Sequence, residues 1–152
     1  AVCNYNMDQM KQAEKKLHLA SNQVPYSMVK RDIEDEVVPY CIENKIGILA
    51  YSPLQRGLLT GKITPAYQFK EGDHRPGTPF YKAENIKIVN DFLNSLLPMA
   101  ADKGITLSQL VIRWTLEQPG ITAALVGARN ATQAAENAKA MEYYQQALKL
   151  AQ

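Results

Sequence analysis

Short apolar segments, separated by stretches of helical periodicity, set the pattern of hydrophobic and polar positions along the chain. The clearest apolar segment is residues 46–51, followed by residues 122–126 and, with weaker apolar character, residues 20–24. Near-continuous apolar runs of this length, without alternation, are typical of parallel strands covered on both faces. Residues 1–3 have the composition of a short remnant of a further strand. We therefore predict three or four parallel strands.

The segments between these runs repeat apolar residues at three- and four-residue spacing, which is typical of helices with one buried face. Pro98 is expected to interrupt the third helix, and Gly104 to end it. Thr106 and Gln109 form a capping box at the start of the fourth. The predicted helices cover residues 7–18, 31–44, 83–103, 107–118 and 130–152.

Strands that alternate with helices predict an α/β fold built from right-handed βαβ units. Residues 53–81 interrupt this alternation with a long stretch rich in glycine, proline and charged residues. A loop of this length in a compact domain is usually functional or disordered. The last predicted helix contains no glycine or proline, and its apolar stripe consists of Ala134, Ala138, Met141, Tyr144, Leu148 and Ala151.

Composition narrows the classes of function. The chain has 152 residues, of which 46% are hydrophobic and 21% charged, as in one ordinary globular domain. The net charge of +2, from scattered basic residues, argues against binding to nucleic acid or to an anionic membrane surface. No apolar run approaches the roughly 20 residues of a membrane span. Cys3 and Cys41 form no disulfide framework, so we expect free thiols and a cytoplasmic location.

Five motifs follow one another in a recognisable order. They are CNYN at residues 3–6, QVPYS at 23–27, GILAYSPLQRGLLTGK at 47–62, VIRW at 111–114 and VGAR at 126–129. In this order they resemble the C-terminal half of a bacterial NADP(H)-dependent aldo-keto reductase. The resemblance covers residues 1–140, whereas residues 141–152 depart from the family and look more like a generic bundle helix. We therefore expect two parts, the family-like residues 1–140 and a helical tail at 141–152.

The resemblance implies half of a (β/α)8 barrel, about strands five to eight with their helices. A complete barrel typically needs about 250 residues, and half of one leaves two strand edges and an apolar face uncovered. We expect self-association into a homo-oligomer to cover them. Two alternatives are a monomer whose tail helix covers the open side, and a different fold in which the tail takes part in an oligomer.

The resemblance also implies an NADPH site at the carboxyl ends of the strands. Asn4 and Gln23 match residues that hold the nicotinamide carboxamide, with Cys3 in place of the family's serine. An amide needs both a donor and an acceptor, which Asn and Gln side chains provide. Tyr51 matches the aromatic residue that stacks on the nicotinamide ring. The segment that contacts the pyrophosphate follows it and includes Ser52, Leu54, Gln55 and Gly57.

The adenosine end of the implied site begins at Gly127. Backbone N–H groups at a helix start favour an anion, and Arg129 would then pair with the 2′-phosphate of the cofactor. Gln133, Glu136 and Asn137 match family residues that contact adenine and ribose.

Each of these residues also has a purely structural alternative. Asn4 would cap the helix that starts near Met7, Gln23 would be a loop residue, and Tyr51 would only pack. At the other end, the structural alternative is a helix cap made by Asn130 and Gln133, beside a solvated Arg129.

Catalysis is not expected from this chain alone. The resemblance places the family's catalytic Asp, Tyr, Lys and His in the first half of the barrel, so no catalytic residue is assigned here. His18 and His74 are expected to be solvated surface residues, although Asp73, His74 and Arg75 fit a variable loop that could touch substrate or cofactor. No zinc-ligand spacing and no Ser-His-Asp order is present.

Two functions remain at this point. In the first, the chain is a fragment of an NADPH-dependent reductase of small aldehydes or ketones that keeps the cofactor-binding half and is inactive alone. In the second, it is an engineered or recombined structural or assembly fragment without biochemical activity; Ala1 in place of Met fits trimming, processing or engineering. Preferential binding of NADPH over NADH separates the two, because only a formed Arg129 site recognises the 2′-phosphate.

Overall fold

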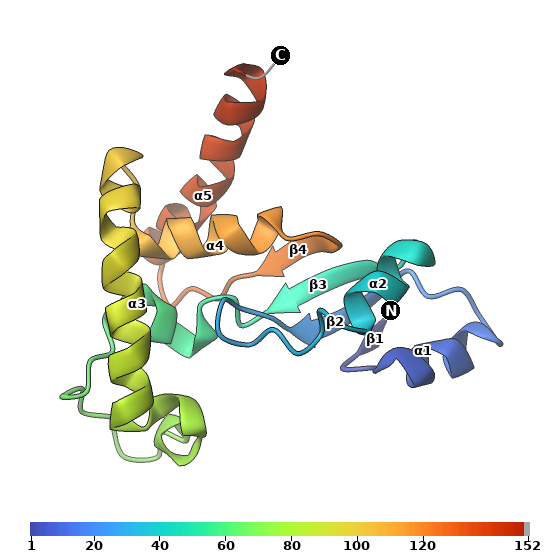
Figure 1. Ribbon diagram of the computed structural model, residues 1–152, viewed down its shortest axis with the longest axis horizontal. Helices are drawn as coiled ribbons and strands as arrows, with labels where there is room; N and C mark the ends of the chain where they lie inside the picture. Colours follow the sequence, from blue (N-terminus) through green and yellow to red (C-terminus); the bar gives the residue numbers. More distant parts are fainter. Residues whose placement is uncertain (151–152) are drawn as a thin grey trace.

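The computed structural model describes residues 1–150, with side chains through residue 141, and shows an α/β fold around a four-stranded parallel sheet (Figure 1). Each strand pairs in parallel with the next. The predicted strands are confirmed with shifts of at most one residue, and their order is consistent with part of a (β/α)8 barrel. The strands, in sheet order, are β1 (Val2–Cys3), β2 (Ser21–Pro25), β3 (Gly47–Tyr51) and β4 (Ile121–Leu125).

Five α-helices accompany the sheet within residues 1–150, and none is long and apolar enough to cross a bilayer. The capping boxes of Asn6 with Gln9 and of Thr106 with Gln109 are both formed, which explains where two of the helices begin. The helices are α1 (Met7–Glu14), α2 (Val37–Glu43), α3 (Ala83–Asp102), α4 (Leu107–Glu117) and α5 (Ala131–Leu150).

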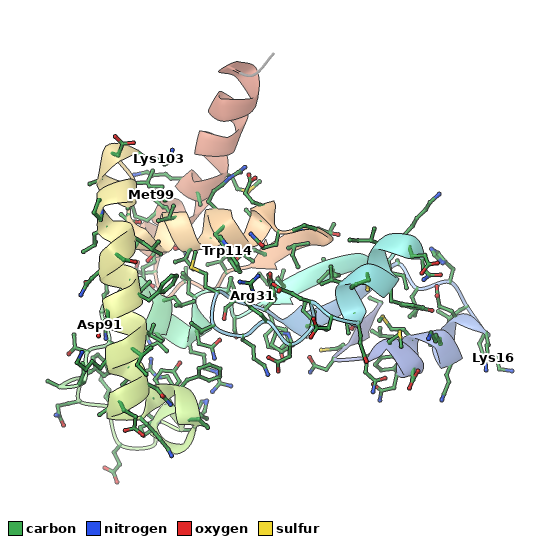
Figure 2. All side chains as sticks on the ribbon, viewed as in Figure 1. Lys16, Arg31, Asp91, Met99, Lys103 and Trp114 are labelled. Carbon is green, nitrogen blue, oxygen red and sulfur yellow. The ribbon has the colours of Figure 1, made fainter. Side chains whose placement is uncertain are left out.

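The predicted start of α2 at residue 31 is wrong, because the side chains before the helix are engaged elsewhere. Arg31 lies over the Trp114 ring of α4 at 5.4 Å from the ring centroid, and its Nε donates to the Glu34 carboxylate at 2.8 Å. Figure 2 shows Arg31 and Trp114 side by side. Trp114 in turn stacks on Tyr26, with centroids 5.7 Å apart. These contacts bind the segment after β2 to α4 and delay the helix until Val37.

The predicted interruption at Pro98 is also wrong, because α3 continues through it. Proline removes one backbone donor, the N–H that would bond to the carbonyl of Asn94. Both residues are exposed, so water can satisfy that carbonyl. The helix ends at Asp102 and Gly104 follows with φ 63°, as expected for the glycine after a helix.

The sheet has one covered and one open face. The alternate residues of β2 and β3 form the open face and are only half-buried; they are Gln23, Leu49 and Tyr51. Their neighbour Leu125 at the end of β4 is 41% exposed. Cover on both faces, expected from the apolar runs, is therefore confirmed for one face only. The covered face lies against α1 and α2 and consists of Asn22, Val24, Ile48 and Ala50.

A second core lies between α3, α4 and the segment after β3. The predicted loop at residues 53–81 contains three 3-10 helices, η1 (Gln55–Thr60), η2 (Arg75–Gly77) and η3 (Pro79–Tyr81). This segment packs against α3, which Figure 1 shows beyond the carboxyl ends of the strands. The loop is therefore a packed part of the fold. The core residues include Leu58, Leu59, Ile63, Tyr81, Leu93 and Val111.

Helix α5 packs through a different face from the one predicted. Ala134, Ala138 and Met141 of the predicted stripe are exposed, whereas Ala140 is buried. The helix lies against α4, where Gln109 donates to the backbone oxygen of Glu136 at 2.9 Å. It then leads away from the sheet (Figure 1), so it does not cover the open face. The side chains of Tyr144, Leu148 and Ala151 lie outside the described residues.

Asn22 provides a test of what ties α1 to the sheet. Its fully buried side chain donates to the Tyr5 carbonyl at 2.8 Å and accepts from the Tyr5 N–H at 3.3 Å. Asn22→Leu keeps the volume but leaves both Tyr5 groups without their partner. We expect the free energy of unfolding, measured by urea titration, to fall by about 2 kcal/mol. Asn94→Leu on the exposed side of α3 should change it by less than about 0.5 kcal/mol; equal effects of the two variants would contradict this account.

Candidate functional site

The carboxyl ends of the strands bring three predicted nicotinamide-binding residues close together. The Asn4 N–H donates to the carbonyl of Gln23 at 2.8 Å, and the Tyr51 hydroxyl donates to Asn4 Oδ1 at 3.2 Å. Asn4 and Tyr51 are 47 residues apart in the chain. The alternative that Asn4 caps α1 is wrong, because Asn6 is the capping residue. The parallel register thus joins residues from three strands at one end of the open face.

The segment after β3 turns sharply through a left-handed backbone. Ser52, Gln55 and Arg56 have φ values of 57°, 44° and 48°, and Gly57 has 97°. Such values are uncommon outside glycine. Leu54, between them, packs on the second core. Residues of this turn line a cavity.

This cavity has a volume of about 1010 Å³, at the upper end of the range for small-molecule and cofactor sites. It extends from the end of β3, past the 52–57 turn and the loop at 71–75, to the start of α5. Asn4, Gln23, Gln55 and Glu136 were also predicted as site residues, but they do not line it. The predicted residues that line it are Tyr51, Ser52, Leu54, Gly57, Gly127, Arg129, Gln133 and Asn137.

Several lining residues were not assigned to the site from the sequence. Lys62 closes the GILAYSPLQRGLLTGK motif, so its position was a usable signal, and Arg56 lies in the same motif. Tyr67 and Ser108 carry no local signal, because only the fold brings α4 and the loop to the cavity. With Arg129, the two cations Arg56 and Lys62 give the cavity a surplus of positive groups suited to a phosphorylated ligand.

The start of α5 shows both of the roles considered for its polar residues. Asn130 Oδ1 accepts from the Gln133 N–H, and Gln133 Oε1 accepts from the Arg129 N–H, each at 2.9 Å. The capping alternative is therefore confirmed for Asn130 and Gln133. Asn137 Nδ2 donates to the Gly127 carbonyl at 3.3 Å, and Arg129 is exposed at the cavity edge. These bonds leave Gln133 Nε2 and Asn137 Oδ1 for other partners.

Glu136 lies away from the cavity. Its carboxylate accepts from Gln109 Nε2 of α4 at 3.3 Å and pairs with Lys139 at 2.6 Å. Glu136 therefore joins α5 to α4 in this structure. An adenine contact by Glu136 would require these partners to be shared or released.

An ion pair anchors the loop that forms the cavity wall. Arg75 binds both carboxylate oxygens of Asp73, with Nη2 to Oδ2 at 2.6 Å and Nε to each oxygen at 3.0 Å. Their side chains are only 12% and 16% exposed. The Arg75 guanidinium, followed by the Arg75 backbone N–H, lowers the pKa of Asp73 to about 2.

The two histidines are exposed, as the sequence predicts. His74 lines the cavity beside Asp73, and His18 lies 3.3 Å from Glu14 beyond the end of α1. Among the residues with described side chains, no group of three His, Cys, Asp or Glu is arranged to hold a metal ion.

The Asp73–Arg75 pair gives a pH prediction. Arg75→Met should raise the pKa of Asp73 from about 2 toward its ordinary 3.8. Since the folded-state value is depressed, the pair stabilises the loop above pH 3.8, and this stabilisation is lost as the pH falls toward 2. The carboxyl-carbon chemical shift of Asp73, followed by NMR against pH, measures it. Lys70→Met, which removes a charge from the same loop, should leave the titration unchanged; an Asp73 that titrates near 3.8 in the unaltered chain would refute the assignment.

Several known proteins are similar to this chain in sequence and in the arrangement of its helices and strands. The chain is 38% identical over 129 residues to the aldo-keto reductase YhdN of Bacillus subtilis, covering 84% of this chain and 39% of YhdN. It is 36% identical over 119 residues to the NADH-specific methylglyoxal reductase of Escherichia coli, covering 78% of this chain and 36% of the relative. Among solved structures, the glycerol dehydrogenase AKR11B4 of Gluconobacter oxydans aligns with a TM-score of 0.84 at 30% identity, covering 90% of this chain and 41% of that one.

The chain thus spans about two fifths of the length of these relatives. The sequence profile of the Aldo/keto reductase family matches residues 1–149, nearly the whole chain. With this match, and with the parallel sheet whose strand ends carry the family motifs, the chain belongs to the aldo/keto reductase family.

Proposed function

We propose that this chain is the cofactor-binding portion of an NADPH-dependent oxidoreductase of small aldehydes or ketones. It would correspond to the C-terminal half of a (β/α)8 barrel, about strands five to eight. The observation that carries the proposal is the cavity that joins Tyr51, the 52–57 turn and the start of α5. An extended dinucleotide, with a ring at one end and phosphates along its length, fits such a cavity better than a compact metabolite does.

The nicotinamide would lie at the strand ends. Tyr51 is half-buried and offers a ring face, and its hydroxyl is already bonded to Asn4. The Asn4 side chain accepts that bond with Oδ1, so its Nδ2 is left to donate to the carboxamide oxygen. Gln23 supplies a second amide from the neighbouring strand. A flat ring held between these groups would present one face for hydride transfer.

The pyrophosphate would lie against the 52–57 turn. Ser52, Leu54 and Gly57 line the cavity there, and Gln55 is held behind them by Ser27, whose hydroxyl donates to Gln55 Oε1 at 3.2 Å. Glycine at position 57 allows close approach of a ligand to the backbone. In this proposal Gln55 shapes the turn, and its neighbours make the contacts.

The adenosine end would lie at the start of α5. Gln133 Oε1 and Asn137 Nδ2 bond to the backbone before the helix, so Gln133 Nε2 and Asn137 Oδ1 remain for adenine and ribose. Arg129, exposed at the rim, is assigned to the 2′-phosphate, which a guanidinium binds in bidentate geometry. The relative from Escherichia coli is NADH-specific by name. In this proposal the choice of NADPH by this chain is assigned to Arg129.

Carbonyl reduction also needs a proton donor beside the developing alkoxide. In the proposed pose Tyr51 is occupied by stacking and by its bond to Asn4. We therefore assign no catalytic residue within this chain and expect it to bind the cofactor without turnover. We also place it in the cytoplasm, where the free thiols of Cys3 and Cys41 would stay reduced.

The second candidate is a structural or assembly fragment in which the family motifs have no present function. The open face and the two unpaired sheet edges favour it, because they are suited to contact with another chain. Nucleotide binding discriminates between the two candidates.

Fluorescence titration with NADPH and NADH tests the first function. We expect saturable NADPH binding, and Arg129→Ala should weaken it by about tenfold or more while leaving NADH binding unchanged, because only NADPH carries the 2′-phosphate. Lys103→Ala, at the far end of α3, removes an equal charge and should have no effect. If neither nucleotide binds, the motifs record ancestry only and the assembly fragment is favoured.

The same samples test the expected lack of turnover. Pure protein mixed with NADPH and a series of small aldehydes and ketones should leave the NADPH absorbance unchanged. Oxidation of NADPH that depends on the added carbonyl compound would show that an acid group within this chain had been missed.

We also propose self-association, which the form of the sheet supports. Four parallel strands with unpaired edges at β1 and β4 are half the number in a closed eight-stranded barrel. Two copies related by a two-fold axis could pair each β4 with the partner's β1 and enclose both open faces. Leu125, on the open face, would be buried in such a dimer.

Size-exclusion chromatography with light scattering measures this at micromolar concentration. We expect a mass of about twice the 17.0 kDa of one chain, and Leu125→Lys should shift the protein toward the monomer. Leu17→Lys, at an exposed position beyond α1, is the matched control. A sharp monomer peak for the unaltered chain would refute self-association.

A further inference from the structure

Residues 52–57 adopt a conformation that their sequence does not favour by itself. Ser52, Gln55 and Arg56 have side chains, yet all have φ values between 44° and 57°. Left-handed backbone at non-glycine residues persists only when the surrounding structure imposes it. Gln55 and Arg56 are consecutive, and Gly57 continues the turn at 97°. Some group outside the turn must therefore hold it.

Two side chains from the loop that ends at η3 bond to the backbone of this turn. Arg75 Nη1 donates to the Arg56 carbonyl at 3.0 Å, and the Tyr81 hydroxyl donates to the Gln55 carbonyl at 2.7 Å. The donors lie 19 and 26 residues further along the chain. They bond to consecutive carbonyls, those of the left-handed residues Gln55 and Arg56. We call Arg75 and Tyr81 the clasp.

The clasp is itself rigidly held. Asp73 binds the other side of the Arg75 guanidinium through both carboxylate oxygens. The centroids of three aromatic rings lie within 6.0 Å of the guanidinium carbon: Phe69 at 5.2 Å, Tyr81 at 5.9 Å and Tyr67 at 6.0 Å. Phe69 meets Tyr67 and Tyr81 edge to face. A planar guanidinium can make all these contacts at once, whereas a lysine ammonium cannot.

The clasped turn forms the part of the cavity that we assign to the pyrophosphate. Ser52, Arg56 and Gly57 of the turn line the cavity, and so do Asp73 and Arg75. Arg75 directs N–H donors of Nε and Nη2 to Asp73 and of Nη1 to the Arg56 carbonyl, so we assign it a role toward a ligand that acts through the turn. Preformed sites bind more tightly because the ligand does not have to order them.

We propose that Arg75 and Tyr81 are positioning residues, which lock the 52–57 turn in its left-handed form and thereby set the affinity of the cavity for a dinucleotide. The second part rests on the proposed function. The first part, the lock on the turn, holds or fails without any ligand.

Hydrogen exchange of the free protein tests the lock. The amides of Gly57 and Leu59, which donate to the Leu54 carbonyl at 3.0 and 3.2 Å, report on the turn. Tyr81→Phe removes one oxygen atom and keeps the ring, so it preserves the fold, and it should speed exchange at these amides by about fivefold, the equivalent of one hydrogen bond. Arg75→Met should have a larger effect, and Arg75→Lys, which keeps the charge, should fall between them.

Two control variants separate the lock from general loosening. Lys70→Met removes a charge from the same loop, and Tyr40→Phe removes a hydroxyl that bonds to Glu14 far from the turn. Neither should alter exchange at Gly57 or Leu59. If Tyr81→Phe and Arg75→Met also leave these amides unchanged, the lock is overturned, whatever the protein binds.

NADPH titration of the same variants tests the positioning role. We expect Arg75→Met to weaken binding by about tenfold and Tyr81→Phe by about fivefold, in the order of their exchange rates. Unchanged affinity together with faster exchange would overturn the link between turn and ligand. Absence of NADPH binding by the unaltered chain would overturn the proposed function and that link together, while the exchange data still decide the lock.

Discussion

The parallel register of β2 and β3 is the constraint on which the rest of the structure depends. It places the carboxyl ends of the strands at one level, so residues that are far apart in sequence, such as Asn4 and Tyr51, meet through a hydrogen bond. The close fit between strands is visible at Gly47, where an added Cβ would lie 3.2 Å from Thr122 Oγ1. The Thr122 hydroxyl also accepts from the Ile48 N–H, at the point where the β3–β4 register shifts. A change of register would move Asn4 and Tyr51 apart even though neither residue itself had changed.

In the 52–57 turn, the surrounding structure stabilises a left-handed backbone that is unfavourable for non-glycine residues. Left-handed backbone costs about 1–3 kcal/mol at each non-glycine residue. The second core supplies part of the compensation, since Leu58 and Leu59 follow the turn and are fully buried. The polar part comes from Arg75 and Tyr81, which bind the exposed carbonyls. The turn is thus held in place beside the cavity that its residues line.

The sequence predicted the elements better than the cavity, for physical reasons. Residues 46–51 were predicted as a strand because a short, near-continuous apolar run is typical of a buried parallel strand, and capping boxes act locally. The predicted start of α2 at residue 31 was wrong because Arg31 packs over Trp114, which is 83 residues away in the chain. The motifs indicated Tyr51 and Arg129, but the wall made by residues 67–75 depends on contacts such as Arg75 with Arg56, which have no periodic signature.

The start of α5 illustrates why capping and ligand binding need not compete. An amide side chain has a donor end and an acceptor end, and the bonds of Gln133 and Asn137 to the backbone before the helix each use one. These residues are therefore already ordered when a ligand arrives. Arg129 differs, because its side chain is exposed and would lose up to about 2 kcal/mol of rotamer freedom on binding a phosphate. Because water screens the charges at an exposed rim, a bidentate contact outweighs that cost there by a smaller margin than it would at a buried site. In the proposed function, the choice between NADPH and NADH would thus depend on how far a neighbouring segment or a second chain buries Arg129.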